Sequence, residues 1–142
     1  MKTSIVLFAA LVTLAGCAAG GKYVSPVDNV RFQSIAVAVQ YAEVVEAFLL
    51  TGTEIQVMEK AKEATAGSLK DPGSAQFRNV RVTKYGDKRV VCGEVNGKNS
   101  YGGYVGFVPF VASTVSATLF NRDGRYPDIQ SAENSGIRYA CS

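Results

Sequence analysis

The sequence predicts an α+β domain in which two N-terminal helices pack on a small antiparallel β-meander. Residues 30–70 carry apolar side chains at helical spacing, whereas residues 77–121 form short β-rich runs separated by turn residues. Helices that precede a run of strands are typical of this fold class. Residues 30–142 are enough for one hydrophobic core, so we expect a single domain.

The first helix is expected over residues 32–50. Apolar residues recur there at helical spacing, at Ile35, Val39, Ala42, Val45 and Leu49. The alternation of apolar residues in 37–41 would also suit a strand, and the length of the apolar run would suit a membrane span. Four polar or charged residues argue against a span: Arg31, Gln40, Glu43 and Glu46.

The second helix is expected to begin after Thr53. Thr53 and Gln56 have the spacing of a capping box, in which each side chain bonds the other residue's backbone N–H. The apolar stripe of this helix is formed by Ile55, Met58, Ala61, Thr65 and Leu69. The turn residues Asp71-Pro72-Gly73 end it.

Four strands are expected after the helices. Residues 77–84 and 89–95 form the first two strands, joined by a turn at Gly86-Asp87. Asn96-Gly97 is a strong two-residue hairpin signal, and the next strands are expected over residues 101–111 and 113–121. Residues 137–141 predict a short last strand beside the second one.

The N-terminus has the pattern of a bacterial export signal. Lys2 gives a positive start, residues 5–14 form an apolar segment, and small Ala15 and Gly16 precede Cys17. Leu14-Ala15-Gly16-Cys17 resembles the lipobox of bacterial lipoproteins. That resemblance implies removal of residues 1–16, acylation of Cys17, and a lipidated tether over residues 17–29 before a periplasmic domain over residues 30–142.

A lipid anchor would make the membrane a permanent partner of this protein. Several acyl chains bind a bilayer far more firmly than one chain, which gives only marginal attachment. Ala18 and Ala19, and not Asp, directly follow Cys17, which resembles the pattern of lipoproteins sent to the outer membrane of Gram-negative cells. We therefore expect attachment to the outer membrane, facing the periplasm.

The sequence leaves two alternatives to lipidation open. The segment could be an ordinary signal peptide followed by an incidental cysteine, or an uncleaved transmembrane anchor. Its apolar run of about ten residues is short of the roughly 20 needed to cross a bilayer.

The other two cysteines, Cys92 and Cys141, form an even pair in an exported chain, which predicts a disulfide. The alternative is a catalytic thiol. The chain contains no histidine that could act as its base.

The lack of histidine also excludes Ser-His-Asp chemistry and histidine-dependent zinc sites. We expect no enzymatic activity, no metal and no cofactor. Without residues 1–16 the chain has 14 basic and 12 acidic residues, a net charge of about +2, which does not suggest nucleic acid as a partner. A nucleotide is not expected either, since the glycine spacing from Gly93 to Gly97 is too short for a P-loop and Asn99 replaces its Ser or Thr.

Two motifs, DPxSAxF over residues 71–77 and CGxVNxKNxxGGYxGF over residues 92–107, resemble a group of small bacterial and phage-encoded proteins that are mostly uncharacterised. The resemblance covers about residues 60–110. It implies no established reaction or ligand.

Residues 96–104 are the expected contact surface. Lys98, Asn99, Tyr101 and Tyr104 lie beside glycines there, a composition typical of polar recognition loops with aromatic contacts. The structural alternative assigns Asn99 and the glycines to turn formation. A local excess of positive charge precedes the loop, at Arg78, Arg81, Lys84, Lys88 and Arg89.

We expect an envelope lipoprotein with a non-enzymatic binding or scaffolding role, whose partner is an envelope protein or an anionic polymer. One alternative is an inhibitor or phage-exclusion factor, which would need a protruding loop. The other is a cell-wall enzyme, which would need a cleft with converging carboxylates.

Overall fold

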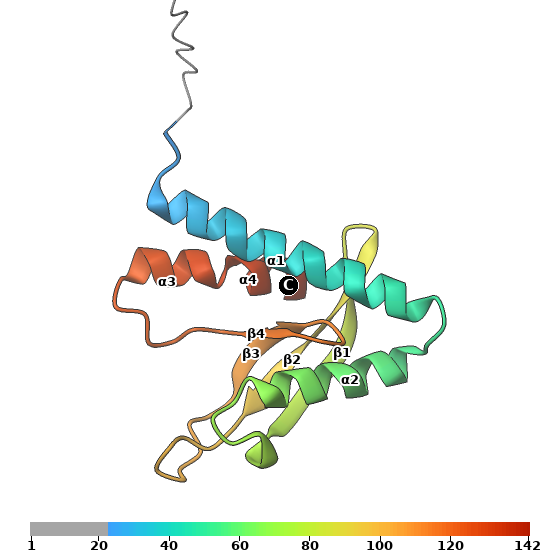
Figure 1. The fold of residues 1–142 in the computed structure, drawn as a ribbon. Coiled ribbons are helices and arrows are strands. Elements are labelled where there is room, and N and C mark those ends of the chain that lie inside the picture. The colour runs from blue at the N-terminus through green and yellow to red at the C-terminus, as the bar shows by residue number, and fades with distance from the viewer. Residues whose placement is uncertain (1–22) are drawn as a thin grey trace, which may run out of the picture.

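The computed structural model describes residues 23–142, which form a mixed structure of four helices and a four-stranded antiparallel sheet (Figure 1). The predicted signal peptide, Cys17 and the first part of the predicted tether, up to residue 22, lie outside the described residues. The sheet has the order β1-β2-β3-β4, so the predicted meander is confirmed. The prediction of two helices is incomplete, because two more follow the sheet.

Helix α1 spans Pro26–Leu49 and therefore begins before the predicted residue 32. The side chain of Ser25 caps it by accepting a hydrogen bond from the Asp28 N–H, and Pro26 occupies the first turn, where its missing N–H costs nothing. Residues 26–29, which were assigned to the tether, thus belong to the helix.

By length and composition alone, α1 could cross a membrane. In the fold it instead covers the sheet, and Ala38, Ala42 and Val45 are buried. Its acidic residues Glu43 and Glu46 form ion pairs with Lys88 and Arg89 of the sheet, respectively. The strand alternative for this segment is wrong.

Helix α2 spans Glu54–Gly67, and its predicted capping box is confirmed. The Thr53 N–H donates to Gln56 Oε1 at 2.9 Å, and the Gln56 N–H donates to Thr53 Oγ1 at 3.3 Å. The buried stripe consists of Val57, Ala61 and Thr65. Ile55, which the pattern placed on this stripe, is 69% exposed.

The strands are β1 (Gln76–Tyr85), β2 (Lys88–Asn96), β3 (Val108–Ala112) and β4 (Ala117–Leu119), and a short 3₁₀ turn at Pro72–Ser74 precedes β1. The first two agree with the prediction to within one residue at each end. The predicted two-residue hairpin at Asn96-Gly97 is wrong, since residues 97–107 form a long connection before β3. The last strand of the meander is also shorter than expected.

The C-terminal segment is helical, so the predicted last strand over residues 137–141 is wrong. Helices α3 (Pro127–Glu133) and α4 (Ser135–Cys141) meet at Asn134, whose buried side chain bonds both the N–H and the C=O of Asn121 at 2.8 Å. A short apolar run does not distinguish strand from helix by periodicity, and this one is buried through helical contacts of Ile137 and Ala140.

Two apolar clusters hold the layers together. One lies between α1, α4 and one face of the sheet, and the other lies between α2, the end of α1 and the opposite face. Phe110 is the largest fully buried side chain, and its ring packs edge-on against Phe77 at a centroid distance of 6.0 Å. Cys92 of β2 and Cys141 of α4 lie at disulfide distance, with their sulfur atoms 2.03 Å apart.

Gly136→Ala is expected to lower stability by about 1–3 kcal/mol through overpacking. A Cβ at this position would lie 2.2 Å from the Ser34 carbonyl oxygen, which is backbone and cannot rotate away. The contact between α4 and α1 would then have to open. Urea unfolding monitored by circular dichroism measures the loss.

Gly67→Ala is the matched control, because a Cβ at Gly67 meets nothing within 4 Å. This variant should be neutral or up to about 1 kcal/mol more stable, since alanine restricts the unfolded chain. Equal stability of the two variants would contradict the close packing of α4 on α1.

Candidate functional site

The connection of residues 97–107, which we call the β2–β3 loop, is the most prominent protrusion of the sheet. Figure 1 shows it projecting from the lower end of the molecule, away from the end at which α1 begins. It contains all four residues expected to contact a partner. The structure therefore places them together on one loop rather than along a strand.

The base of the β2–β3 loop is fixed by contacts between the two sequence motifs. Ser74 Oγ accepts a hydrogen bond from the Lys98 N–H at 2.9 Å and donates to the Asp71 carbonyl at 2.7 Å. On the other side of the base, Asn96 Oδ1 accepts from the Gly106 N–H at 2.9 Å. Gly106 has a φ of +92°, which glycine adopts without strain.

The tip of the loop is organised by Asn99. Its backbone exchanges hydrogen bonds with Gly102 and Gly103 at 3.0 and 2.9 Å. Its side-chain Oδ1 accepts from the N–H groups of Tyr101 and Gly103 at 3.0 and 3.1 Å. Asn99 thus shapes the turn, as the structural alternative expected, and holds the neighbouring side chains in place.

The side chains that project from this frame are aromatic and basic. Tyr101 is 97% exposed and Tyr104 is 47% exposed. The backbones of Lys98 and Tyr104 form an isolated antiparallel β-bridge across the loop. The Lys98 ammonium lies 5.5 Å from the centroid of the Tyr104 ring. Two tyrosines and a lysine are therefore presented to solvent on a hydrogen-bonded support.

An apolar hollow of about 230 Å³ lies beside the loop. Its apolar lining comes from the segment just after α2, the loop and the sheet, at Leu69, Val95, Val105, Val108 and Leu119. Lys70 and Lys98 also line it. Leu69 and Lys70 were not predicted at this site, although both directly precede the DPxSAxF motif, whose Ser74 contacts the loop.

A charged cluster packs against Phe107, the last residue of the β2–β3 loop. Arg78 donates two hydrogen bonds to Glu94, at 2.9 and 3.0 Å, and its guanidinium lies 4.1 Å from the centroid of the Phe107 ring. Asn79, at a bulge in β1 with a φ of +55°, donates a third bond to Glu94 at 3.0 Å. These bonds lower the pKa of Glu94 and raise the pKa of Arg78.

The basic residues of the β1–β2 hairpin do not form a free positive patch. Arg78, Lys88 and Arg89 are all in ion pairs with acidic residues. Arg81 donates to the Cys141 carbonyl at 3.0 Å. Most of this charge therefore stabilises contacts between the elements of the fold.

Among residues 23–142, no group of three or more Cys, Asp or Glu side chains could hold a metal ion. Glu94, near the end of the loop, is held by Arg78. The loop presents two partly or fully exposed aromatic rings, hydrogen-bonding groups and one lysine.

No protein-family model, curated protein or solved structure matches this chain.

Proposed function

We propose that this protein is an envelope-anchored lipoprotein with a non-enzymatic binding role, and that the β2–β3 loop and the adjoining hollow are its contact surface. The observation that carries this proposal is the nearly full exposure of Tyr101 on a loop whose backbone is fixed by Asn99 and Ser74. Rigid exposed tyrosines give large contact areas at low entropic cost.

The lining of the hollow favours a protein partner. An apolar side chain of the partner would enter the space between Leu69 and Val105, and acidic neighbours would meet Lys70 and Lys98. An anionic polymer could pair with the lysines but would leave the apolar lining in water. The expected partner is therefore an envelope protein that presents an apolar residue beside acidic ones.

The lipobox-like sequence ending at Cys17 supports attachment to the membrane, and the residues after it favour the outer membrane, facing the periplasm. This anchor would concentrate the protein at the envelope, so a partner of modest affinity would still be bound there.

The triple change Lys98→Ala, Tyr101→Ala, Tyr104→Ala tests the contact surface. Truncating several residues at the centre of an interface costs about 1–2 kcal/mol or more, so we expect at least a tenfold loss of a partner captured from the native membrane. The melting temperature should be kept, because Tyr101 is exposed, Tyr104 is half-exposed and Lys98 is not buried. Affinity capture and thermal unfolding measure the two effects.

A matched triple change elsewhere, Ile55→Ala, Lys84→Ala, Tyr126→Ala, removes one lysine and two large exposed side chains and should leave capture unchanged. If the loop variant unfolds, or retains the partner as well as this control does, the proposal is wrong. A captured phage or cell-wall enzyme that the protein inhibits would instead support the inhibitor alternative, for which a protruding loop is also required.

A further inference from the structure

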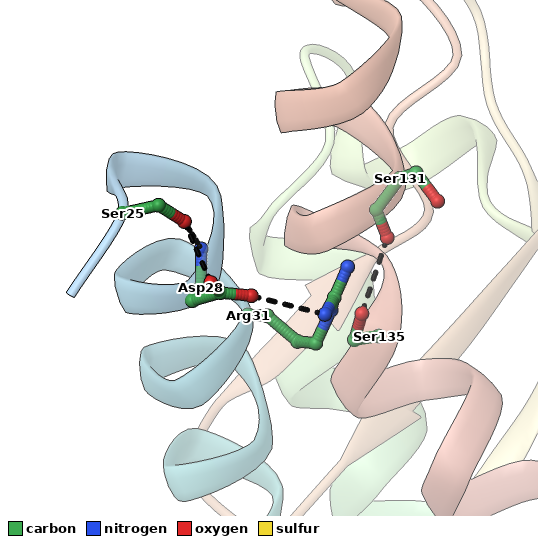
Figure 2. A network of polar contacts seen from close by, with 5 residues as sticks. All are labelled: Ser25, Asp28, Arg31, Ser131 and Ser135. Carbon is green, nitrogen blue, oxygen red and sulfur yellow. Dashed lines mark hydrogen bonds and ion pairs between the residues drawn. The ribbon is translucent and has the colours of Figure 1, made fainter.

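A second surface lies at the end of the molecule where α1 begins and α3 meets α4. A hollow of about 390 Å³ is lined there by two arginines, Arg31 and Arg138, and by Ser131, Ser135, Tyr139 and Ser142. Figure 2 shows the Arg31 side chain extending from α1 toward the α3–α4 junction. We call Arg31, Phe32, Ser131, Arg138 and Tyr139 the anchor-proximal surface.

The arginines of this surface have free capacity for an anion. Arg31 forms one ion pair, with Asp28 at 3.2 Å, and both side chains are about half-exposed, so water competes with this pair. In the part of the chain that the structure describes, Arg138 has no carboxylate within ion-pair distance, and its guanidinium lies 5.6 Å from the Phe120 ring centroid. Guanidinium groups bind phosphate oxygens through two parallel hydrogen bonds.

Exposed aromatic side chains accompany these arginines. Phe32 and Tyr139 are 73% and 63% exposed, and Tyr23, just before α1, is 87% exposed. On α1, no charged residue follows Arg31 until Glu43. Aromatic rings beside basic groups are typical of protein surfaces at the level of lipid head groups.

The position of this surface favours a membrane as its occupant. Residues 18–25 are all that separate Cys17 from the start of α1, and at up to about 3.6 Å per residue they reach about 30 Å at most. This step depends on the lipidation of Cys17 proposed above. An anchored Cys17 would keep the arginines within a short distance of the bilayer surface.

We infer that the anchor-proximal surface docks on anionic phospholipid head groups of the membrane that holds the anchor. Arg31 and Arg138 bind the phosphates, while Phe32 and Tyr139 enter the interface between head groups and acyl chains. The attraction between arginines and phosphates is electrostatic, so high salt weakens the docking.

The chain contains no tryptophan, which provides a direct test. Tyr139→Trp places a single tryptophan, which can be excited selectively, on the surface of the full lipidated protein, which is reconstituted in phosphatidylcholine vesicles with or without phosphatidylglycerol. We expect the emission to shift to shorter wavelength, and brominated lipid to quench it, only where phosphatidylglycerol is present. High salt should reverse both effects.

Charge variants made in the Tyr139→Trp protein identify the groups responsible. Arg31→Gln with Arg138→Gln should abolish the shift, whereas Lys60→Gln with Lys84→Gln, an equal loss of exposed charge elsewhere, should not. A tryptophan on α2, Ile55→Trp, should keep the emission of a water-exposed side chain in both vesicles. Circular dichroism of each variant checks that the fold is kept.

Three results would overturn the docking inference: no shift in either vesicle, an equal shift in phosphatidylcholine alone, or an equal effect of the lysine pair. Mass spectrometry of the same preparation separates this failure from that of the proposed function. An acylated Cys17 with unshifted emission rejects only the docking, whereas an unmodified Cys17 rejects the lipoprotein proposal and the docking that depends on it.

Discussion

Cys17→Ser is expected to yield an uncleaved precursor that carries no lipid label. The peptidase that recognises a lipobox acts on an acylated cysteine, and serine has no thiol to accept the acyl groups. The effect should be a complete loss of labelling, because no other residue can replace Cys17 at this position. Metabolic labelling with a fatty acid and the mass of the N-terminal peptide measure it.

The control for this experiment is the double change Cys92→Ser, Cys141→Ser, which removes the other two thiols and should leave labelling intact. If Cys17→Ser protein is cleaved and labelled like the unchanged protein, the lipobox interpretation is wrong.

Removal of the cysteine pair itself is expected to cost about 4 kcal/mol of folding free energy. Cys92 and Cys141 are 49 residues apart in the sequence, and closing a loop of this length restricts the unfolded chain by about that amount. The loss is a large share of the 5–15 kcal/mol that stabilises a typical domain. Urea unfolding of Cys92→Ala, Cys141→Ala protein under non-reducing conditions measures it.

The expected structural consequence is the release of α4, which has seven residues and would not be stable alone. Reducing the unchanged protein should give the same loss of stability as the double change. Two free thiols in the native protein, found by non-reducing mass spectrometry, would contradict the disulfide.

The sequence was most informative where its local signals agreed with one another. Helix α2 was predicted because Thr53 and Gln56 cap a segment with an apolar stripe, and that cap is present. The β1–β2 hairpin was predicted because two β-rich runs flank a Gly-Asp turn, and Gly86 there has a φ of +65°. In both cases the contacts that decide the structure lie within a few residues.

The errors occurred where distant contacts decide the structure. The segment 137–141 is too short for its periodicity to be read, and it is helical because Gly136 fits against Ser34 and Asn134 bonds Asn121. The Asn96-Gly97 hairpin signal was overridden because Asn96 bonds Gly106 instead of forming a tight turn. No local pattern shows contacts of this kind.

The candidate site was predictable in part. Its composition indicated Lys98, Asn99, Tyr101 and Tyr104, and the structure places all four on the β2–β3 loop. The hollow was not predictable, because it depends on the segment after α2, with Leu69 and Lys70, lying beside the loop, where Ser74 bonds Lys98.

The opposite placement of the start of α1 and the β2–β3 loop limits which partners the protein could reach (Figure 1). With the start of α1 resting on the bilayer, the β2–β3 loop would lie at the far end of the molecule, where Tyr101 would be clear of the lipid. Integral proteins that do not project from the same leaflet would then be out of reach of the loop. The loop would instead contact soluble proteins or the facing layer of the envelope.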